Sequence, residues 1–304
     1  MQLFHKTNFD FIGHRWLFFT ISAVMILAGI ASLVVKGGPR LGVDFTGGSL
    51  VQIRFNQGTA TEEVRKTLDD NGFVNSEIQS FLDSNVFIIR IQKSEIPMTE
   101  VANKVEQAFK SKWGEGSFTV ERTEMVGPRV GEALSEQALW AIIFSWIGII
   151  VYVAFRFKST AHGVAGVIAL MHDVTITVGF FSLMNKEISL TIIAALLTLI
   201  GYSINDTIVV YDRIRESMRL LRNKTLGEII NTSINDTLSR TIITSSTVII
   251  VLIALYIWGG EVIHDFSLAL LIGVIVGTYS SIAVASPLVY EWETRKAKKR
   301  AAVK

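Results

Sequence analysis

Six long apolar runs dominate the chain and are separated by shorter polar segments. They cover Trp16–Val35, Leu139–Phe155, Gly163–Met184, Ile188–Val210, Ile242–Trp258 and Phe266–Tyr290. An α-helix needs about 20 predominantly apolar residues to cross ~30 Å of hydrocarbon. The pattern therefore predicts an α-helical membrane protein with six transmembrane helices.

The first run could instead belong to a signal peptide. The apolar core of a signal peptide is shorter than this run, and no A-x-A cleavage site precedes Lys36–Pro39. We therefore expect a retained helix.

A polar and mixed segment, Gly37–Gln137, separates the first two runs. Alternation at Val51, Ile53 and Phe55 indicates a strand. The pattern further predicts a helix at Thr61–Asn71, strands at Glu77–Leu82 and Val86–Gln92, a helix at Pro97–Trp113 and a last strand at Phe118–Arg122. The order β-α-β-β-α-β is typical of a ferredoxin-like α+β domain between helices 1 and 2. The predicted organisation is a first helix within residues 1–36, this domain at 37–137, five helices at 138–290 and a basic tail at 291–304.

Basic residues gather in alternate loops of the chain. Those loops hold Lys6, Arg15, Arg156, Lys158 and the tail at 295–300. In the other two loops, 185–187 and 259–265, Lys186 is the single basic residue apart from histidine. By the positive-inside rule both termini are cytoplasmic, and the α+β domain is extracytoplasmic in a multi-pass inner-membrane protein. The tail is expected to lie near anionic membrane lipid.

One long loop, Tyr211–Thr241, is rich in arginine. It is amphipathic, and we expect a helix that lies along the membrane face.

Composition narrows the function. Half of the 304 residues are apolar and 18% are charged, against roughly 25% charged in soluble domains. The mean hydropathy is +0.43, and the net charge of +2 gives no support for nucleic-acid binding. The absence of cysteine removes disulfides and thiolate metal sites, and neither HExxH nor a P-loop is present. We expect no cofactor and no enzymatic activity, but the use of a transmembrane ion gradient.

An acidic residue interrupts the fourth apolar run. A charge at the centre of a membrane helix costs at least about 2.5–3.5 kcal/mol, so Asp206 indicates a pathway or a partner. Thr198, Tyr202 and Asp206 share a helix face, and Asn205 lies on a neighbouring stripe. The alternative is a helix that ends before Asp206, but the apolar residues at 208–210 argue against it.

Arg240 opens the fifth run. Snorkelling to the cytoplasmic interface is one interpretation of this arginine. The other is a buried ion pair with Asp206, because the fourth and fifth helices run in opposite directions and bring both residues near the cytoplasmic side. A fixed cation beside a titratable carboxylate would form a proton gate.

His172 and Asp173 interrupt the third run. Two interpretations stay open: a relay or gating element, and an interhelical hydrogen bond that fixes packing. Gly273 and Gly277 form a GxxxG pattern that favours close helix packing.

Five segments form a combination that spans nearly the full chain. They are Leu41–Gly48, His172–Asp173, Gly201–Arg213, Ser239–Thr241 and Gly277–Ser281. The combination resembles the SecF family, the smaller membrane subunit of the bacterial SecD–SecF complex. That family is similar to half of a resistance-nodulation-division transporter, with SecD as the other half.

The resemblance implies that the chain acts with SecD, the SecYEG translocon and a YajC-type accessory subunit on exported preproteins. It implies that the proton motive force, or a sodium gradient in some relatives, helps to pull exported chains across. The family's ion-coupling pair falls on Asp206 and Arg240. The expected ion-coupling residues are Asp206, Arg240, Asp173, His172, Tyr202 and Asn205. The expected structural motif residues are Gly42, Asp44, Gly47, Gly48, Gly273 and Gly277.

Two other functions are open at this point. One is a resistance-nodulation-division exporter of small molecules or lipids, although such pumps usually carry two sets of six helices and two large external domains in one chain. The other is an assembly factor that transports nothing, in which the polar membrane residues only join helices.

Overall fold

The computed structural model describes residues 7–74, 76–81, 85–91, 97–157 and 159–302. The chain forms two compact units, one of residues 41–140 and one of residues 1–40 together with 141–304. We call them the α/β domain and the helical unit. Lys6, Lys158, Leu82 and Gln92, which entered the sequence predictions, lie outside the described residues.

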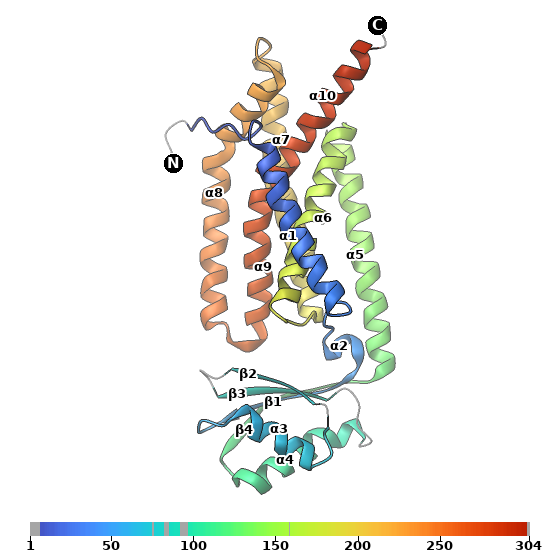
Figure 1. The fold of residues 1–304 in the computed structure, drawn as a ribbon, viewed down its shortest axis with the longest axis vertical. Coiled ribbons are helices and arrows are strands. Elements are labelled where there is room, and N and C mark those ends of the chain that lie inside the picture. Colours follow the sequence, from blue (N-terminus) through green and yellow to red (C-terminus); the bar gives the residue numbers. More distant parts are fainter. Residues whose placement is uncertain (1–6, 75, 82–84, 92–96, 158, 303–304) are drawn as a thin grey trace. The chain divides into compact units, whose positions relative to one another are not determined.

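Long apolar helices account for the predicted membrane spans (Figure 1). They are α1 (Arg15–Val35), α5 (Pro128–Phe157), α6 (Thr160–Leu183), α7 (Leu190–Leu220), α8 (Leu226–Trp258) and a last span made of α9 (Gly260–Ser280), the π-helix η1 (Ser281–Ala285) and α10 (Ser286–Ala302). Six spans in the described part of the chain are long and apolar enough to cross a membrane. The predicted fold class is confirmed.

The segment 211–241 is helical, as predicted, but it is divided between the ends of two long helices and does not form a helix of its own. Helix α7 continues to Leu220, and α8 begins at Leu226 after a short turn. The Thr225 side chain and Glu228 form a reciprocal capping box that starts α8. Arg213 and Asp236 join the two extensions at 2.6 Å. The charged residues therefore cover the ends of two long helices, which project beyond the length that hydrocarbon requires.

The helices also extend past the other predicted limits. Helix α5 begins at Pro128, inside the predicted α+β segment, because proline suits the first position of a helix. The basic tail continues α10 to Ala302.

The α/β domain is a four-stranded antiparallel sheet covered on one face by two helices (Figure 1). Its elements are β1 (Gly48–Phe55), α3 (Thr61–Asp70), β2 (Glu77–Phe81), β3 (Val86–Ile91), α4 (Met98–Trp113) and β4 (Phe118–Val126). The strand order is β2-β3-β1-β4, as in a ferredoxin-like fold. The apolar side chains of β1, including Val51, Ile53 and Phe55, pack against the helices in a single core.

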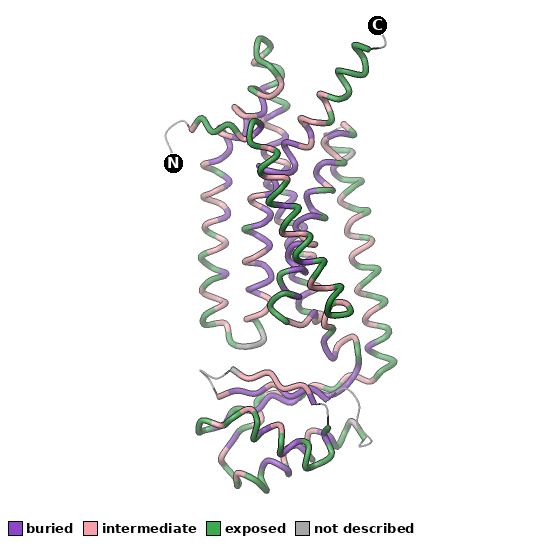
Figure 2. Tube along the Cα trace, in the orientation of Figure 1, coloured by how far each residue is buried: buried purple, intermediate pink, exposed green. Residues whose placement is uncertain are grey.

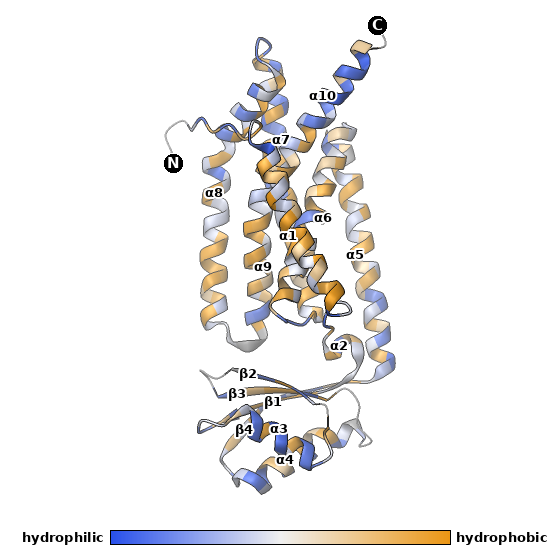
Figure 3. Cartoon of the chain, in the orientation of Figure 1, coloured by the Kyte–Doolittle hydropathy of each residue, from blue (hydrophilic) through white to orange (hydrophobic). Residues whose placement is uncertain are grey.

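The helices of the helical unit differ in how far they are buried (Figure 2). Much of α6, α7 and α9 is buried, whereas α1 and α5 are mostly exposed and α8 is mostly intermediate. The exposed surface is apolar, as Leu27 on α1, Phe155 on α5 and Ile250 on α8 illustrate. Hydrophilic residues gather at the end of α10 and around the turn between α7 and α8 (Figure 3). This distribution suits helices that face lipid along their middle and water at their ends.

Candidate functional site

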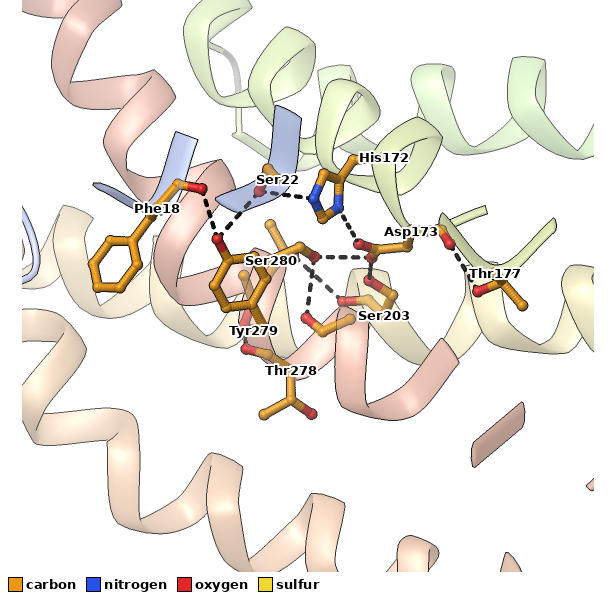
Figure 4. Close-up of polar contacts among 12 residues, drawn as sticks. Phe18, Ser22, His172, Asp173, Thr177, Ser203, Thr278, Tyr279 and Ser280 are labelled. Atoms are coloured by element: carbon orange, nitrogen blue, oxygen red, sulfur yellow. Dashed lines mark hydrogen bonds and ion pairs between the residues drawn. The ribbon is translucent and has the colours of Figure 1, made fainter. Parts of the chain in front are cut away.

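A buried polar network joins four helices of the helical unit (Figure 4). At its centre, Asp173 of α6 is 1% exposed and His172 is 5% exposed. The Nδ1 atom of His172 lies 2.9 Å from Oδ1 of Asp173. The hydroxyls of Ser203 on α7 and Ser280 on α9 donate to Oδ2 of Asp173 at 2.5 and 2.8 Å. The carboxyl group of Asp173 is therefore hydrogen-bonded at both oxygens, to residues of three helices.

The network reaches α1 through the other ring nitrogen of His172. Nε2 lies 3.0 Å from the hydroxyl of Ser22, which lies 3.1 Å from the hydroxyl of Tyr279 on α9. The Tyr279 hydroxyl donates to the Phe18 carbonyl at 2.8 Å. Serine and tyrosine in an otherwise apolar bundle thus supply the partners that the buried histidine needs.

Glycines on α9 allow α7 to come close to this network. A Cβ on Gly273 would lie 2.5 Å from the Leu199 side chain. A Cβ on Gly277 would lie 3.1 Å from the Ser203 side chain and 3.5 Å from Oδ2 of Asp173. The GxxxG pattern therefore lies at the contact between α9 and α7, where it leaves room for the Ser203–Asp173 hydrogen bond.

Asp206 lies one turn after Ser203 on α7 and is 5% exposed. Its Oδ2 atom is buried and has no hydrogen-bond partner among the described residues. Ser245 of α8 contacts the carboxylate, and the positive charge of Arg240 interacts electrostatically with it. The Ser245 hydroxyl shares a 2.7 Å hydrogen bond with Thr278 on α9 and accepts one from the Tyr202 hydroxyl at 3.4 Å. The buried polar atom of Asp206 is thus the least satisfied carboxylate oxygen of this region, which is unusual in a protein interior.

The predicted buried ion pair differs from what the structure shows. Arg240 is exposed on the surface of this chain, and in the described residues no ion pair within 4.0 Å joins it to Asp206. Arg240 is thus an exposed residue, whereas Asp206 is buried. The two residues share a region of α7 and α8 but not a direct bond.

Arg240 belongs to a set of exposed residues on these two helices that have no apolar side chain. The set is Thr198, Gly201 and Asn205 on α7 and Arg240 and Thr247 on α8. We call this set the polar face. Tyr202, between these residues, is half-buried. A face of this kind within membrane spans contrasts with the apolar surface that the same chain exposes elsewhere.

The glycine motif lies at the start of the α/β domain, around the short helix α2 (Val43–Thr46). Gly47 and Gly48 have φ angles of +70° and +135°, which favour glycine, whereas Gly42 has an ordinary extended backbone with φ −72°. Asp44 lies in the first turn of α2. The motif is remote in sequence from the carboxylates and makes no part of their network.

Sequence reasoning missed several members of the network. It did not assign Phe18, Ser22, Ser203, Tyr279 or Ser280 to a network, although the segments Gly201–Arg213 and Gly277–Ser281 contain the last three. The available signal was a serine at i−3 from Asp206 and a Tyr-Ser pair after Gly277. Within the described residues, no three His, Asp or Glu side chains converge in a way that would hold a metal ion.

Comparison with known proteins places the chain in a family. A family model described as "Protein export membrane protein SecD/SecF, C-terminal" matches residues 104–295, and one described as "SecD/SecF GG Motif" matches residues 31–59. The chain is 42% identical over 299 residues to the protein translocase subunit SecF of Endomicrobium trichonymphae, covering 98% of this chain and 96% of that protein. It is 44% identical over 293 residues to the SecF subunit of Magnetococcus marinus, covering 95% of this chain and 94% of that one.

A solved structure agrees with these relatives. The crystal structure of SecDF from Thermus thermophilus, a translocon-associated membrane protein, is 38% identical and matches 95% of this chain with a TM-score of 0.86. The present chain spans only 39% of the length of that SecDF chain. The sequence matches, the six apolar spans and the four-stranded domain lead to one conclusion: the chain belongs to the SecD/SecF family of protein-export membrane proteins.

Proposed function

We propose that this chain works with SecD to use the proton motive force, or a sodium gradient, to drive late stages of protein translocation across the bacterial inner membrane. The observation that carries the proposal is the buried Asp206 carboxylate, whose Oδ2 has no partner among the described residues while the charge of Arg240 reaches it. Relatives named as translocase subunits support a transport role, and we propose no catalytic reaction.

The polar face supports SecD as the partner. An arginine exposed to hydrocarbon costs about 2.5–3.5 kcal/mol at the centre of a span and less near its ends, where Arg240 lies. A second membrane protein with a polar surface of its own would remove that cost. The SecDF structure, which is more than twice as long as the part that this chain matches, supports a SecD-like half as the cover.

In the proposed mechanism Asp206 is the titrating group and Arg240 the fixed charge. Protonation neutralises Asp206 and weakens its attraction to the guanidinium, so α7 and α8 become free to shift against their partner. One charge moved across ~100 mV supplies about 2.3 kcal/mol, which is comparable to the free-energy difference between two conformers of a protein. Tyr202 and Asn205 would line the path that the ion follows to Asp206.

Membership of the SecD/SecF family supports the choice of the remaining partners. We propose association with the SecYEG translocon and a YajC-type subunit, contact with exported preproteins, and anionic lipid around the basic end of α10. Both termini would be cytoplasmic, so the α/β domain would meet the exported chain on the far side.

Substitution of Asp206 by asparagine tests the proposal. Asparagine keeps the shape of the side chain but cannot titrate, so the variant complex should assemble and lose gradient-dependent translocation in membrane vesicles. The matched control is Asp212→Asn on the same helix. Asp212 pairs with Arg156 at 2.5 Å on a partly exposed surface, where an ion pair is worth only about 0–1 kcal/mol. Full gradient dependence in an assembled Asp206→Asn complex would remove Asp206 from the mechanism.

A further inference from the structure

The hydrogen bonds between Phe18 and His172 can run in only one direction. A carbonyl oxygen can only accept a hydrogen bond, so the Tyr279 hydroxyl donates its one proton to the Phe18 carbonyl, 2.8 Å away. Tyr279 must then accept from Ser22, 3.1 Å away. Because the Ser22 hydroxyl donates its proton to Tyr279, it must accept a hydrogen bond from Nε2 of His172, 3.0 Å away. His172 therefore carries a proton on Nε2.

The second ring nitrogen of His172 shares another proton with Asp173. Nδ1 and Oδ1 lie 2.9 Å apart, a distance that requires one proton between them. Whether that proton rests on nitrogen or on oxygen, the pair holds two protons and has no net charge. Neutrality matters here because both side chains are almost fully buried, and a buried net charge is costly.

This series of hydrogen bonds cannot pass a proton onward. It ends at the Phe18 carbonyl, which has no proton to give and accepts none covalently. At the other end, Oδ2 of Asp173 accepts hydrogen bonds from the hydroxyls of Ser203 and Ser280, and the Ser280 hydroxyl also lies 3.1 Å from the Gly277 carbonyl, which has no proton to give. From α1, α7 and α9, the groups in contact with the pair in the described residues are serine hydroxyls, and Tyr279 is the one titratable side chain behind them.

We propose that His172 and Asp173 form a net-neutral, proton-sharing lock that fastens α1, α6, α7 and α9 and positions Asp206, without carrying the coupled ion. Two contacts provide the positioning. Ser203 holds α7 one turn before Asp206, and Thr278, two residues before Ser280 on α9, bonds to the Ser245 hydroxyl at 2.7 Å. The positioning role rests on the proposed function of Asp206, whereas the protonation state does not.

Nitrogen-15 NMR of the histidine ring in the full complex, reconstituted in lipid nanodiscs, tests the protonation state. Wild-type His172 should show a protonated Nε2. Tyr279→Phe frees the Ser22 hydroxyl to donate to the ring, so the population of protonated Nε2 should fall. Tyr152→Phe, an exposed tyrosine on α5, should change nothing. An unprotonated Nε2 in the wild type, or a Tyr279→Phe spectrum identical to it, would overturn the lock.

A pair of variants tests positioning against ion carrying. Asp173→Asn keeps the pair neutral and hydrogen-bonded, because an amide N–H can donate to Nδ1 of His172 while the amide oxygen accepts from Ser203 and Ser280, so gradient-dependent translocation should be largely retained. Asp173→Leu removes these hydrogen bonds, and translocation should fall at least about fivefold, the low end of coupling between two sites. An ion-carrying Asp173 predicts that Asp173→Asn is as inactive as Asp173→Leu, which would overturn the proposal.

These outcomes separate the lock from the wider function. If Asp206→Asn retains full gradient dependence while His172 is protonated at Nε2 and responds to Tyr279→Phe, the proposed function fails and the lock stands. If Asp206→Asn is inactive and His172 is unprotonated at Nε2, the lock fails alone.

Discussion

A Cβ atom built on Gly29 of α1 would lie 2.8 Å from the Cα atom of Gly179 on α6. The two helices therefore cross with no side chain between them. This crossing lies two turns from Ser22 along α1 and two turns from His172 along α6. The close approach of the two helices therefore holds Ser22 and His172 within hydrogen-bond distance of each other.

Alanine at Gly179 should destabilise the helical unit. The added methyl group meets the α1 backbone, and overpacking of a fitted contact typically costs about 1–3 kcal/mol. The thermal unfolding midpoint of the purified protein in detergent should fall. Gly163→Ala on the same helix is the control, because a Cβ there meets nothing within 4 Å. Equal midpoints for the two variants would show that the crossing opens at little cost.

The close crossing and the polar network explain which parts of the site the sequence could predict. The apolar spans and the β-α-β-β-α-β order are local patterns, and they appeared directly in the periodicity. The partners of Asp173 are not local: Ser280 lies 107 residues away and Ser22 lies 150 residues from His172. A serine in an apolar helix fits packing as well as function, so its type alone does not reveal which carboxylate it serves.

Two further differences have the same origin. The arginines of 211–241 indicated an amphipathic helix along the membrane face, whereas Arg213 and Asp236 form an ion pair between the extensions of α7 and α8. Arg240 looked like half of a buried pair because charge complementarity is visible in sequence, whereas the direction of a long side chain depends on the surrounding helices.

The N-terminal strap, residues 9–14, should loosen in acid. Phe9 and Asn235 of α8 exchange two hydrogen bonds of 2.9 Å, and Asn231 donates to Asp10 at 2.6 Å. The Gly13 backbone N–H and Asn231 lower the pKa of Asp10 below its usual value. A lowered folded-state pKa contributes stability above the unfolded pKa of about 3.9, and that contribution is lost as pH falls through the folded value.

Hydrogen exchange of the strap amides between neutral pH and pH 3 measures this loss. In the wild type protection should be constant down to about pH 4 and then decline, after correction for the intrinsic exchange rate. Asp10→Asn should be less protected at neutral pH and show no such decline. Asp69→Asn on α3 should behave like the wild type. An acid decline of equal size in Asp10→Asn would assign it to another group.

Valine at Gly47 should impair translocation more than it impairs protein accumulation. Gly47 has φ +70°, and a Cβ there would lie 3.1 Å from the Pro128 Cα at the start of α5. The backbone strain alone costs about 1–2 kcal/mol. Gly116→Val separates the two effects, because Gly116 has φ +80° but nothing within 4 Å. Translocation per unit of complex should fall in Gly47→Val and stay near the wild type in Gly116→Val. Equal activity in both variants would leave the junction of α2 and α5 without a role in the mechanism.

Arg240 should respond differently to two substitutions. Methionine keeps much of the length of the side chain but removes the charge that reaches Asp206, so gradient-dependent translocation should be lost. Lysine keeps a charge, but as a compact ammonium without the planar fork, and it can lose its proton when a partner covers it. We expect Arg240→Lys to fall between the wild type and Arg240→Met.

Because Arg240 lies on the polar face, assembly must be measured beside activity. Co-purification with SecD, followed by translocation in vesicles with and without an imposed gradient, distinguishes a lost interface from a lost coupling charge. Arg219→Met, on the exposed end of α7, removes an arginine away from the polar face and should leave both measurements unchanged. If Arg240→Met assembles normally and still responds fully to the gradient, the fixed charge beside Asp206 is unnecessary, and the carboxylate must titrate against a group supplied by the partner.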